Sequence, residues 1–124
     1  DIDKSVELLK DHPKAASVIS IVEVGNNHPM KMKVFVDGCR IDNYETPPTE
    51  NPPRQSLPDI YIVNGAIYAT RRSVLMDSNS FSGNFSLGMK MPDSRSVNID
   101  KEHDLVLAEY YMQQQKLIAP LPLD

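Results

Sequence analysis

The segment SVNID, residues 96–100, places two oxygen-bearing side chains two positions apart. If this segment forms a strand, Asn98 and Asp100 project from one face, because side chains alternate along a strand. An amide oxygen and a carboxylate suit a hard cation such as Mg²⁺, which takes one or two carboxylates and completes its shell with water and phosphate. Asp100 also directly precedes a predicted helix, where a carboxylate can act as the N-cap. The pattern therefore leaves metal binding and helix capping as alternatives.

A second group of candidates lies in RQSLPDIYIVNGAIY, residues 54–68. Arg54 follows a proline-rich loop, and its planar guanidinium can bind a carboxylate through two hydrogen bonds. A lone arginine in such a loop is also typical of a solvated charge. Asn64-Gly65 is typical of a turn or a bulge, with ligand contact as the second interpretation.

Other candidates have ordinary structural roles as their alternatives. Tyr68 and Phe81 are typical core aromatics, although a buried Tyr68 hydroxyl needs a polar partner. Gln55 follows Arg54 at the end of the proline loop, and Lys31 lies near the start of a predicted hairpin, where surface charge is its usual role. Considered singly, none of these residues identifies a site.

Composition limits the classes of function. The 124 residues are 40% hydrophobic with a net charge of −4, which fits one globular domain. This acidic balance disfavours binding to nucleic acid or to an anionic membrane surface, but it allows a small anionic substrate held by local cations. No apolar run reaches the roughly 18 residues of a membrane span, and no signal-peptide pattern opens the chain, so we expect a cytoplasmic protein. Cys39 is the only cysteine, which excludes an intrachain disulfide and a thiolate zinc cluster, and its usual role is that of a packed hydrophobe.

The hydrophobic pattern predicts an α/β fold. Residues 2–11 form an amphipathic helix with Ile2, Val6 and Leu9 on one stripe. Residues 15–24 form an apolar, β-branched run that is typical of a strand covered on both faces. A helix followed by such a strand indicates a sheet with helices on its faces.

Further elements follow in order. We expect a hairpin at 25–45 with its turn at Asp37-Gly38, because alternating residues flank a turn pair. The stretch 46–58 holds five of the ten prolines and is therefore an extended loop. The remaining predictions are a strand at 59–70 bent at Asn64-Gly65, a short helix at 71–77, a loop and strand within 81–91, a strand at 96–100, a helix at 101–117 and a loose tail at 118–124.

The order of these motifs is more specific than any one of them. The chain contains HPMK at 28–31, RQSLPDIYIVNGAIY at 54–68, SFSG at 80–83 and SVNIDKEHDLVLAE at 96–109. In order and approximate spacing these blocks resemble the CMP-sialic acid synthetases, or CMP-nonulosonate cytidylyltransferases. The resemblance covers nearly the whole chain and implies a nucleotidyltransferase-like, Rossmann-like three-layer sheet.

The resemblance also implies a reaction and a set of site residues. Enzymes of this family transfer CMP from CTP to an acidic nonulosonic sugar and release pyrophosphate, with Mg²⁺ as cofactor. By motif match, the catalytic residues are Asp100 and Arg54, with Asp100 and Asn98 on the metal side. The hairpin and proline loop, at about 27–60, match a dimerisation extension, which implies a homodimer. The sugar pocket is implied for Lys31, Arg54, Gln55, Asn64, Tyr68 and Phe81.

Two departures from the family pattern shape the expectation for this chain. Asn98 stands where the family usually has the first aspartate of Asp-x-Asp, and no glycine-rich phosphate loop occurs in the sequence. Because the chain begins at Asp1 in a helical pattern, we expect residues 1–124 to be the C-terminal part of a cytidylyltransferase domain whose first strands are missing. Alone, the chain is expected to be inactive and to expose a sheet edge or an apolar face. The alternative is a catalytically inactive, stand-alone sugar-binding or dimerisation module.

Overall fold

A computed structural model of the chain describes residues 1–118. Most of the predicted loose tail at 118–124 therefore lies outside the described residues. The chain divides into two compact units. One comprises residues 1–22 and the chain from Val63 onward, and we call it the sheet unit. The other, residues 23–62, is called the hairpin unit.

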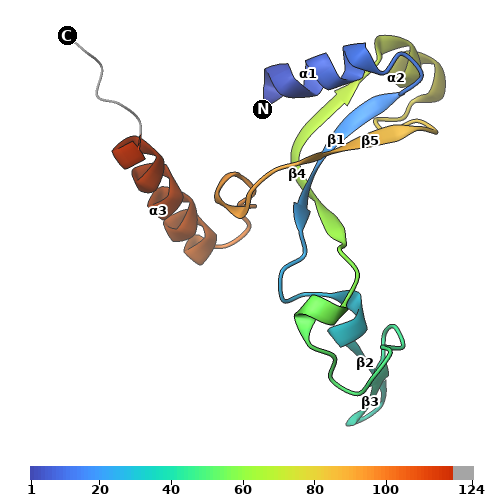
Figure 1. The fold of residues 1–124 in the computed structure, drawn as a ribbon, viewed down its shortest axis with the longest axis vertical. Helices are drawn as coiled ribbons and strands as arrows, with labels where there is room; N and C mark the ends of the chain where they lie inside the picture. Colours follow the sequence, from blue (N-terminus) through green and yellow to red (C-terminus); the bar gives the residue numbers. More distant parts are fainter. Residues whose placement is uncertain (119–124) are drawn as a thin grey trace. The chain divides into compact units, whose positions relative to one another are not determined.

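Three strands form the sheet, in the order β4-β1-β5 (Figure 1). They are β1 (Ser17–Glu23), β4 (Tyr61–Thr70) and β5 (Ser86–Lys90). Strands β1 and β5 run parallel with Ser17 opposite Ser86. Strand β4 runs antiparallel to β1, because the Arg71 N–H donates to the Ala16 carbonyl at one end and the Val24 N–H donates to Ile60 at the other. The sheet is thus mixed, and the α/β class is confirmed.

Helix α1 (Ile2–Asp11) packs on the sheet, as its amphipathic pattern predicts. The buried core of the sheet unit includes the cluster Val18, Met89 and Met91, against which Leu8 and Leu9 pack. The predicted stripe of Ile2, Val6 and Leu9 is right for Leu9 and wrong for Ile2 and Val6, which are exposed. The buried face instead runs through Ser5, whose hydroxyl donates to the Ile2 carbonyl at 2.6 Å and so can be buried without an unpaired polar group.

Helix α2 (Arg72–Ser78) follows β4 where a short helix was expected. Arg71, the residue before it, donates through its side chain to the carbonyls of Leu9, His12 and Ala15. The bonds to Leu9 and His12 satisfy carbonyl groups at the end of α1, and the bond to Ala15 reaches the segment between α1 and β1. Gly83 has a φ of +67° and leaves no space for a Cβ, which would lie 2.6 Å from the Cβ of Ala16.

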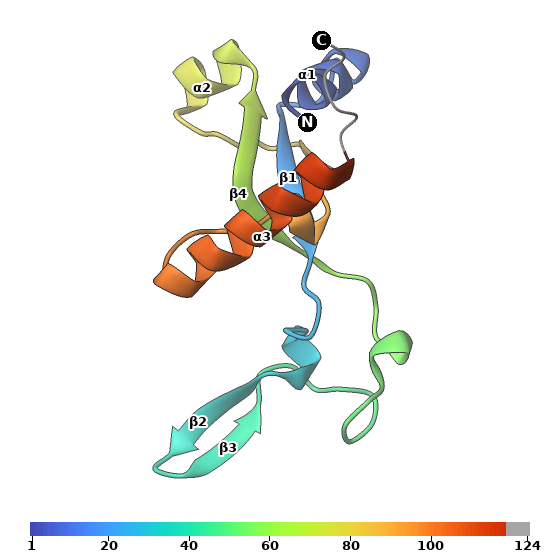
Figure 2. The same cartoon turned by 90° about the vertical axis from the view of Figure 1, so that its left-hand side faces the viewer.

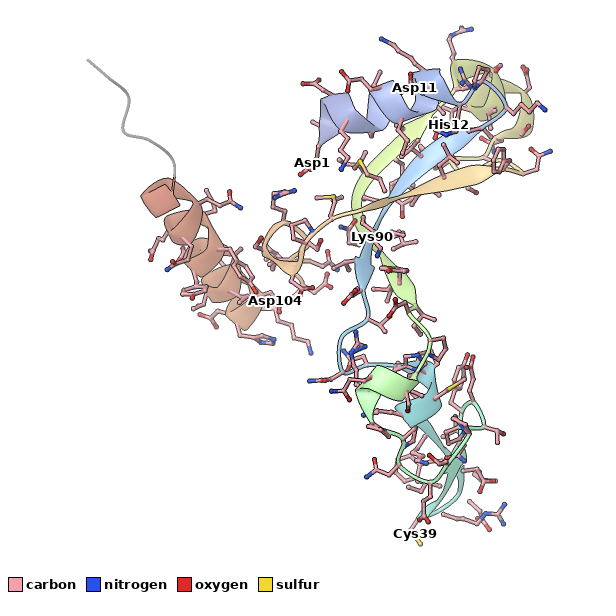
Figure 3. The ribbon with its side chains drawn as sticks, in the orientation of Figure 1. Asp1, Asp11, His12, Cys39, Lys90 and Asp104 are labelled. Carbon is pink, nitrogen blue, oxygen red and sulfur yellow. The ribbon has the colours of Figure 1, made fainter. Side chains whose placement is uncertain are left out.

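The hairpin unit contains the predicted β-hairpin, formed by β2 (Lys33–Asp37) and β3 (Arg40–Asn43), which lie side by side in Figure 2. The turn lies at Gly38-Cys39, one residue later than the predicted Asp37-Gly38, and Gly38 has a φ of +57°. Cys39 is exposed at the tip of this hairpin, so the expectation that its thiol is packed is wrong (Figure 3). The proline-rich stretch is a loop, as predicted, with two short 3₁₀ helices in the unit: η1 (Pro29–Lys31) and η2 (Arg54–Ser56).

After β5 come a third 3₁₀ helix, η3 (Asp93–Arg95), and helix α3 (Glu102–Ile118). The prediction of a closing helix is confirmed, whereas the predicted strand at 96–100 is wrong, because this segment has no strand pairing. The sequence analysis expected an exposed apolar face. Large apolar side chains are exposed on β4 and α3: Ile62, Val63, Leu105, Val106, Tyr110 and Met112. No helix within residues 1–118 has the length and apolar character to cross a membrane.

Candidate functional site

Asn98 and Asp100 come together, but not by the predicted route. They lie in an irregular segment before α3, and the Asn98 amide nitrogen donates to the Asp100 carboxylate at 2.6 Å. A loop thus achieves the proximity that strand alternation was expected to give. In this arrangement Asn98 presents its amide nitrogen, not its oxygen, to Asp100.

The start of α3 is capped by a residue that the sequence analysis did not single out. The Asp104 carboxylate accepts hydrogen bonds from the backbone N–H groups of Lys101 at 2.8 Å and Asp100 at 3.1 Å. This carboxylate therefore satisfies donors at the helix start that have no partner within the helix. The capping interpretation of Asp100 is wrong, because its side chain accepts from Asn98 instead.

The same contacts set the ionisation of Asp104, which is labelled at the start of α3 in Figure 3. The hydrogen bond from the Lys101 N–H lowers the pKa of Asp104 below its ordinary 3.8, while desolvation opposes the shift. The Asp100 N–H and the charges of His103 and Lys101 also lower this pKa. The carboxylate form is therefore the one that the helix terminus selects.

The donor set around Asp100 fits one kind of Mg²⁺ site only. No group of three His, Cys, Asp or Glu side chains within residues 1–118 is arranged to hold a metal ion. A cage made entirely of protein ligands is therefore not formed by these residues. Mg²⁺ commonly binds through one or two carboxylates together with substrate phosphates, and the exposed Asp100 carboxylate suits that mode.

Tyr68 and Phe81 form an aromatic pair on the surface of the sheet unit. Their ring centroids are 6.1 Å apart and their planes are inclined by 58°, a tilted geometry that aromatic rings favour. Tyr68 is 48% exposed and Phe81 is 62% exposed, so the interpretation of these rings as core residues is wrong. The structure brings two of the predicted sugar-pocket residues together on β4 and the loop after α2.

Asn64 lies at the bend of β4 and is occupied by internal hydrogen bonds. Its carbonyl oxygen accepts from the Ser20 hydroxyl at 2.6 Å and from the Ala66 N–H at 3.1 Å, and its amide nitrogen donates to the Ser96 hydroxyl at 2.9 Å. Gly65 has a φ of +73°, which confirms the predicted irregularity at Asn64-Gly65. Asn64 thus links three segments of the sheet unit, and these contacts give it a structural role.

Arg54 is held at one end of η2 in the hairpin unit. Its guanidinium donates to the Gly25 carbonyl at 2.9 Å and forms an ion pair with Glu23 at 3.4 Å. The side chain remains 36% exposed. A guanidinium carries five N–H donors, and the two bonds to Gly25 and Glu23 leave donors for a further acceptor. The structure therefore fixes the direction of Arg54 and does not bury it.

Lys31 and Gln55 are the other predicted residues in this unit. Lys31 lines an open hollow of about 330 Å³ between the start of the hairpin and the proline loop. Gln55 is exposed on η2, next to Arg54. The hollow is formed by Met30, Lys31, Lys33, Pro47, Glu50, Asn51 and Pro52.

The predicted residues therefore fall into two sets. Lys31, Arg54 and Gln55 belong to the hairpin unit, whereas the others belong to the sheet unit. The sequence analysis missed Asp104 and also His28, which is 1% exposed. Asp104 could have been predicted, because it is an acid three residues after Lys101, the N-cap position of α3. His28 could not, because its hydrogen-bond partner Pro58 lies 30 residues away in the sequence.

The chain is distantly similar to a protein of named activity. No known family profile matches the chain. The chain is 30% identical over 98 residues to the CMP-N,N'-diacetyllegionaminic acid synthase of Campylobacter jejuni. The match includes 79% of this chain and 36% of that protein, so the chain spans about a third of the length of the relative. This distant likeness suggests the nonulosonate cytidylyltransferases, the family that the sequence motifs resemble.

Proposed function

We propose that this chain supplies the sugar-binding and metal-binding portion of a cytidylyltransferase that transfers CMP from CTP to a nonulosonic acid. The observation that carries the proposal is the 98-residue match to a protein named as a CMP-N,N'-diacetyllegionaminic acid synthase. The motifs RQSLP and NGAIY resemble the same class of enzyme.

The chemistry assigns roles to the two sets of residues. The anomeric hydroxyl of the sugar attacks the α-phosphorus of CTP and loses its proton to solvent, a new P–O bond forms, the bond to the β-phosphate oxygen breaks, and pyrophosphate leaves. Arg54 and Lys31 would neutralise and orient the acidic sugar, because a guanidinium binds a carboxylate through two hydrogen bonds. Gln55, Tyr68 and Phe81 would shape the sugar site, and the exposed aromatic pair offers an apolar surface to the sugar ring. Most of the rate gain in such a transfer comes from positioning and charge neutralisation.

Asp100 would hold Mg²⁺ against the triphosphate, where the ion neutralises charge on the leaving pyrophosphate. Asn98 would act first as the hydrogen-bond donor that orients this carboxylate, as it does in the structure. Asn64 would support the site from within β4 through its contacts to Ser20 and Ser96.

The architecture of the assembled enzyme is part of the proposal. The mixed sheet is compatible with a nucleotidyltransferase-like topology, to which further strands would add at its edges. The hairpin unit, residues 23–62, would serve as the extension through which two copies form a homodimer. We further propose that the protein works in the cytoplasm, where CTP is available.

The direct test is an assay of pyrophosphate release by the full-length protein with CTP, Mg²⁺ and an acidic nonulosonic sugar. N,N'-diacetyllegionaminic acid and N-acetylneuraminic acid are the first two substrates to compare. We expect equal amounts of pyrophosphate and CMP-sugar from one of them, and no activity from the 124-residue chain alone. If the full-length protein forms no CMP-sugar with any nonulosonic acid, the proposal is wrong.

A second candidate function is a sugar-binding or dimerisation module without catalysis. The observation that favours it is the hydrogen bond from Asn98 to Asp100, because a neutral amide occupies a position where a second carboxylate would strengthen Mg²⁺ binding. Sugar binding by calorimetry, without any pyrophosphate release from the full-length protein, would support this candidate.

A further inference from the structure

His28 is the most deeply buried side chain of the hairpin unit. It is 1% exposed, whereas all residues of β2 and β3 are exposed. A buried imidazole needs partners for both ring nitrogens, and His28 has them. Its Nδ1 accepts from the Met30 N–H at 3.2 Å, and its Nε2 lies 3.0 Å from the Pro58 carbonyl oxygen.

These two contacts fix the tautomer of the ring. Because the Met30 N–H can only donate, Nδ1 must carry a lone pair, and Nε2 carries the proton that is donated to Pro58. The ring therefore acts as a two-ended connector. One end caps η1, the 3₁₀ helix that ends at Lys31. The other end binds the chain two residues beyond η2, the helix that contains Arg54 and Gln55.

We propose that His28 is a positioning residue that holds Lys31 in register with Arg54 and Gln55. The inference rests on the proposed function, since it concerns the same sugar-side residues. The buried apolar residues of the unit are Pro52 and Leu57, and Arg54 itself bonds to Gly25. Hydrogen bonds from a rigid buried ring maintain such a geometry better than contacts between mobile side chains do.

Two substitutions separate the two ends of the connector. His28→Asn retains a short side-chain oxygen that can accept from the Met30 N–H, but it is too short to reach Pro58. His28→Gln retains a nitrogen with the reach of Nε2, but it places no acceptor at the Nδ1 position. His12→Asn is the matched control, because His12 is an exposed histidine whose ring contacts the Leu8 carbonyl at the end of α1.

The first readout is steady-state kinetics of the full-length protein. We expect each His28 substitution to raise KM for the acidic sugar by about fivefold, the effect of one lost hydrogen bond, and to leave KM for CTP unchanged. His12→Asn should change neither constant. If the substituted proteins are folded and the sugar KM is unchanged, or if both KM values rise together, the positioning role is wrong.

The second readout is amide hydrogen exchange, which does not depend on catalysis. In His28→Asn, exchange should accelerate at Ser56 and Leu57 and stay slow at Met30, whereas His28→Gln should show the opposite pattern. If the wild-type protein makes no CMP-sugar, the proposed function fails, and this crossover alone decides the role of His28. Absence of the crossover, or loss of the sheet unit's protection in both variants, would overturn the inference.

Discussion

The sheet unit and the hairpin unit hold their candidate residues in different ways. In the sheet unit, Asn64 is bound on all sides and Asp100 is paired with Asn98. In the hairpin unit, Arg54 is tied by two contacts, while Lys31 and Gln55 extend into solvent-exposed space. The polar candidate side chains of the sheet unit therefore bond mostly to other groups of that unit. Those of the hairpin unit keep more hydrogen-bonding groups available to a ligand.

The largest effect on activity is expected at Asp100, which lies in the sheet unit but is proposed to bind a ligand. Asp100→Ala should lower turnover by the full-length protein at least about 100-fold, because even residues that only support a metal ligand contribute 10–100-fold. Stability should change little, since Asp104 and not Asp100 caps α3. Asp11→Ala, at the exposed end of α1, is the control in the pyrophosphate assay. Full activity of Asp100→Ala would remove the metal role.

Arg54→Lys tests whether the hairpin unit acts on the ligand. Lysine keeps the charge but loses the two-pronged geometry for a carboxylate, so the sugar KM should rise about 10- to 100-fold. The melting temperature should stay close to that of the wild type, since the bond to Gly25 and the ion pair with Glu23 are both exposed. Arg40→Lys changes the same residue type in the same unit, beside Asp42, and should leave the KM unchanged.

Asn64 should show the opposite behaviour, with the main effect on stability. Asn64→Ala removes the nearer of two acceptors of the buried Ser20 hydroxyl, at 2.6 Å, and leaves the Ile67 carbonyl at 3.2 Å; with the bond to Ser96 also lost, the free energy of unfolding should fall by about 1–3 kcal/mol. Asn64→Asp keeps the acceptor for Ser20 and Ala66 and should lose less. Urea unfolding of the full-length protein measures both. A large rise in sugar KM with unchanged stability would instead make Asn64 a ligand contact.

Tyr68 and Phe81 lie in the sheet unit, but their substitution should mainly affect sugar binding, as expected for residues of the hairpin unit. Tyr68→Ala and Phe81→Ala should each raise the sugar KM by up to about tenfold, the range of an aromatic contact. The double substitution should raise it by less than the product of the two, because the rings contact each other. Tyr68→Phe separates the role of the ring from that of the hydroxyl. Effects that multiply fully would show that the rings act independently.

The smallest effect concerns Asp104 and pH. Its lowered pKa means that the carboxylate's contribution to the start of α3 is fully present above about pH 3.8 and is lost as the pH falls through the still lower folded value. Amide NMR shifts of Asp100 and Lys101 should therefore move together with the titration of this carboxyl. Asp104→Asn should abolish that transition, and Asp93→Asn should leave it intact.

Local sequence signals predicted the elements whose causes are local. The Asp37-Gly38 pair predicted the hairpin, and the prolines at 46–58 predicted the loop, because turn residues act through their own backbone angles. The irregularity at Asn64-Gly65 was predicted for the same reason. The motif order also predicted a relationship to CMP-nonulosonate synthesis that the distant likeness supports.

Predictions failed where a distant partner decides. Five alternating residues at 96–100 resembled a strand, but a strand needs a neighbour to pair with, and this segment instead follows η3 into the start of α3. Ser5 was not expected on the buried face of α1, because hydrophobic periodicity does not count serine as a core residue, although a local bond to the Ile2 carbonyl makes its burial acceptable. The contact from His28 to Pro58 joins residues 30 positions apart, and no local pattern reveals it.

The exposed thiol at the hairpin tip has a practical consequence. Cys39 is the only cysteine of the chain and lies at the turn between β2 and β3. A maleimide dye or a nitroxide would therefore attach at a single known position without any engineering. The same accessibility means that an oxidising buffer can join two molecules covalently through this thiol, so the chain should be handled in a reductant until the label is attached.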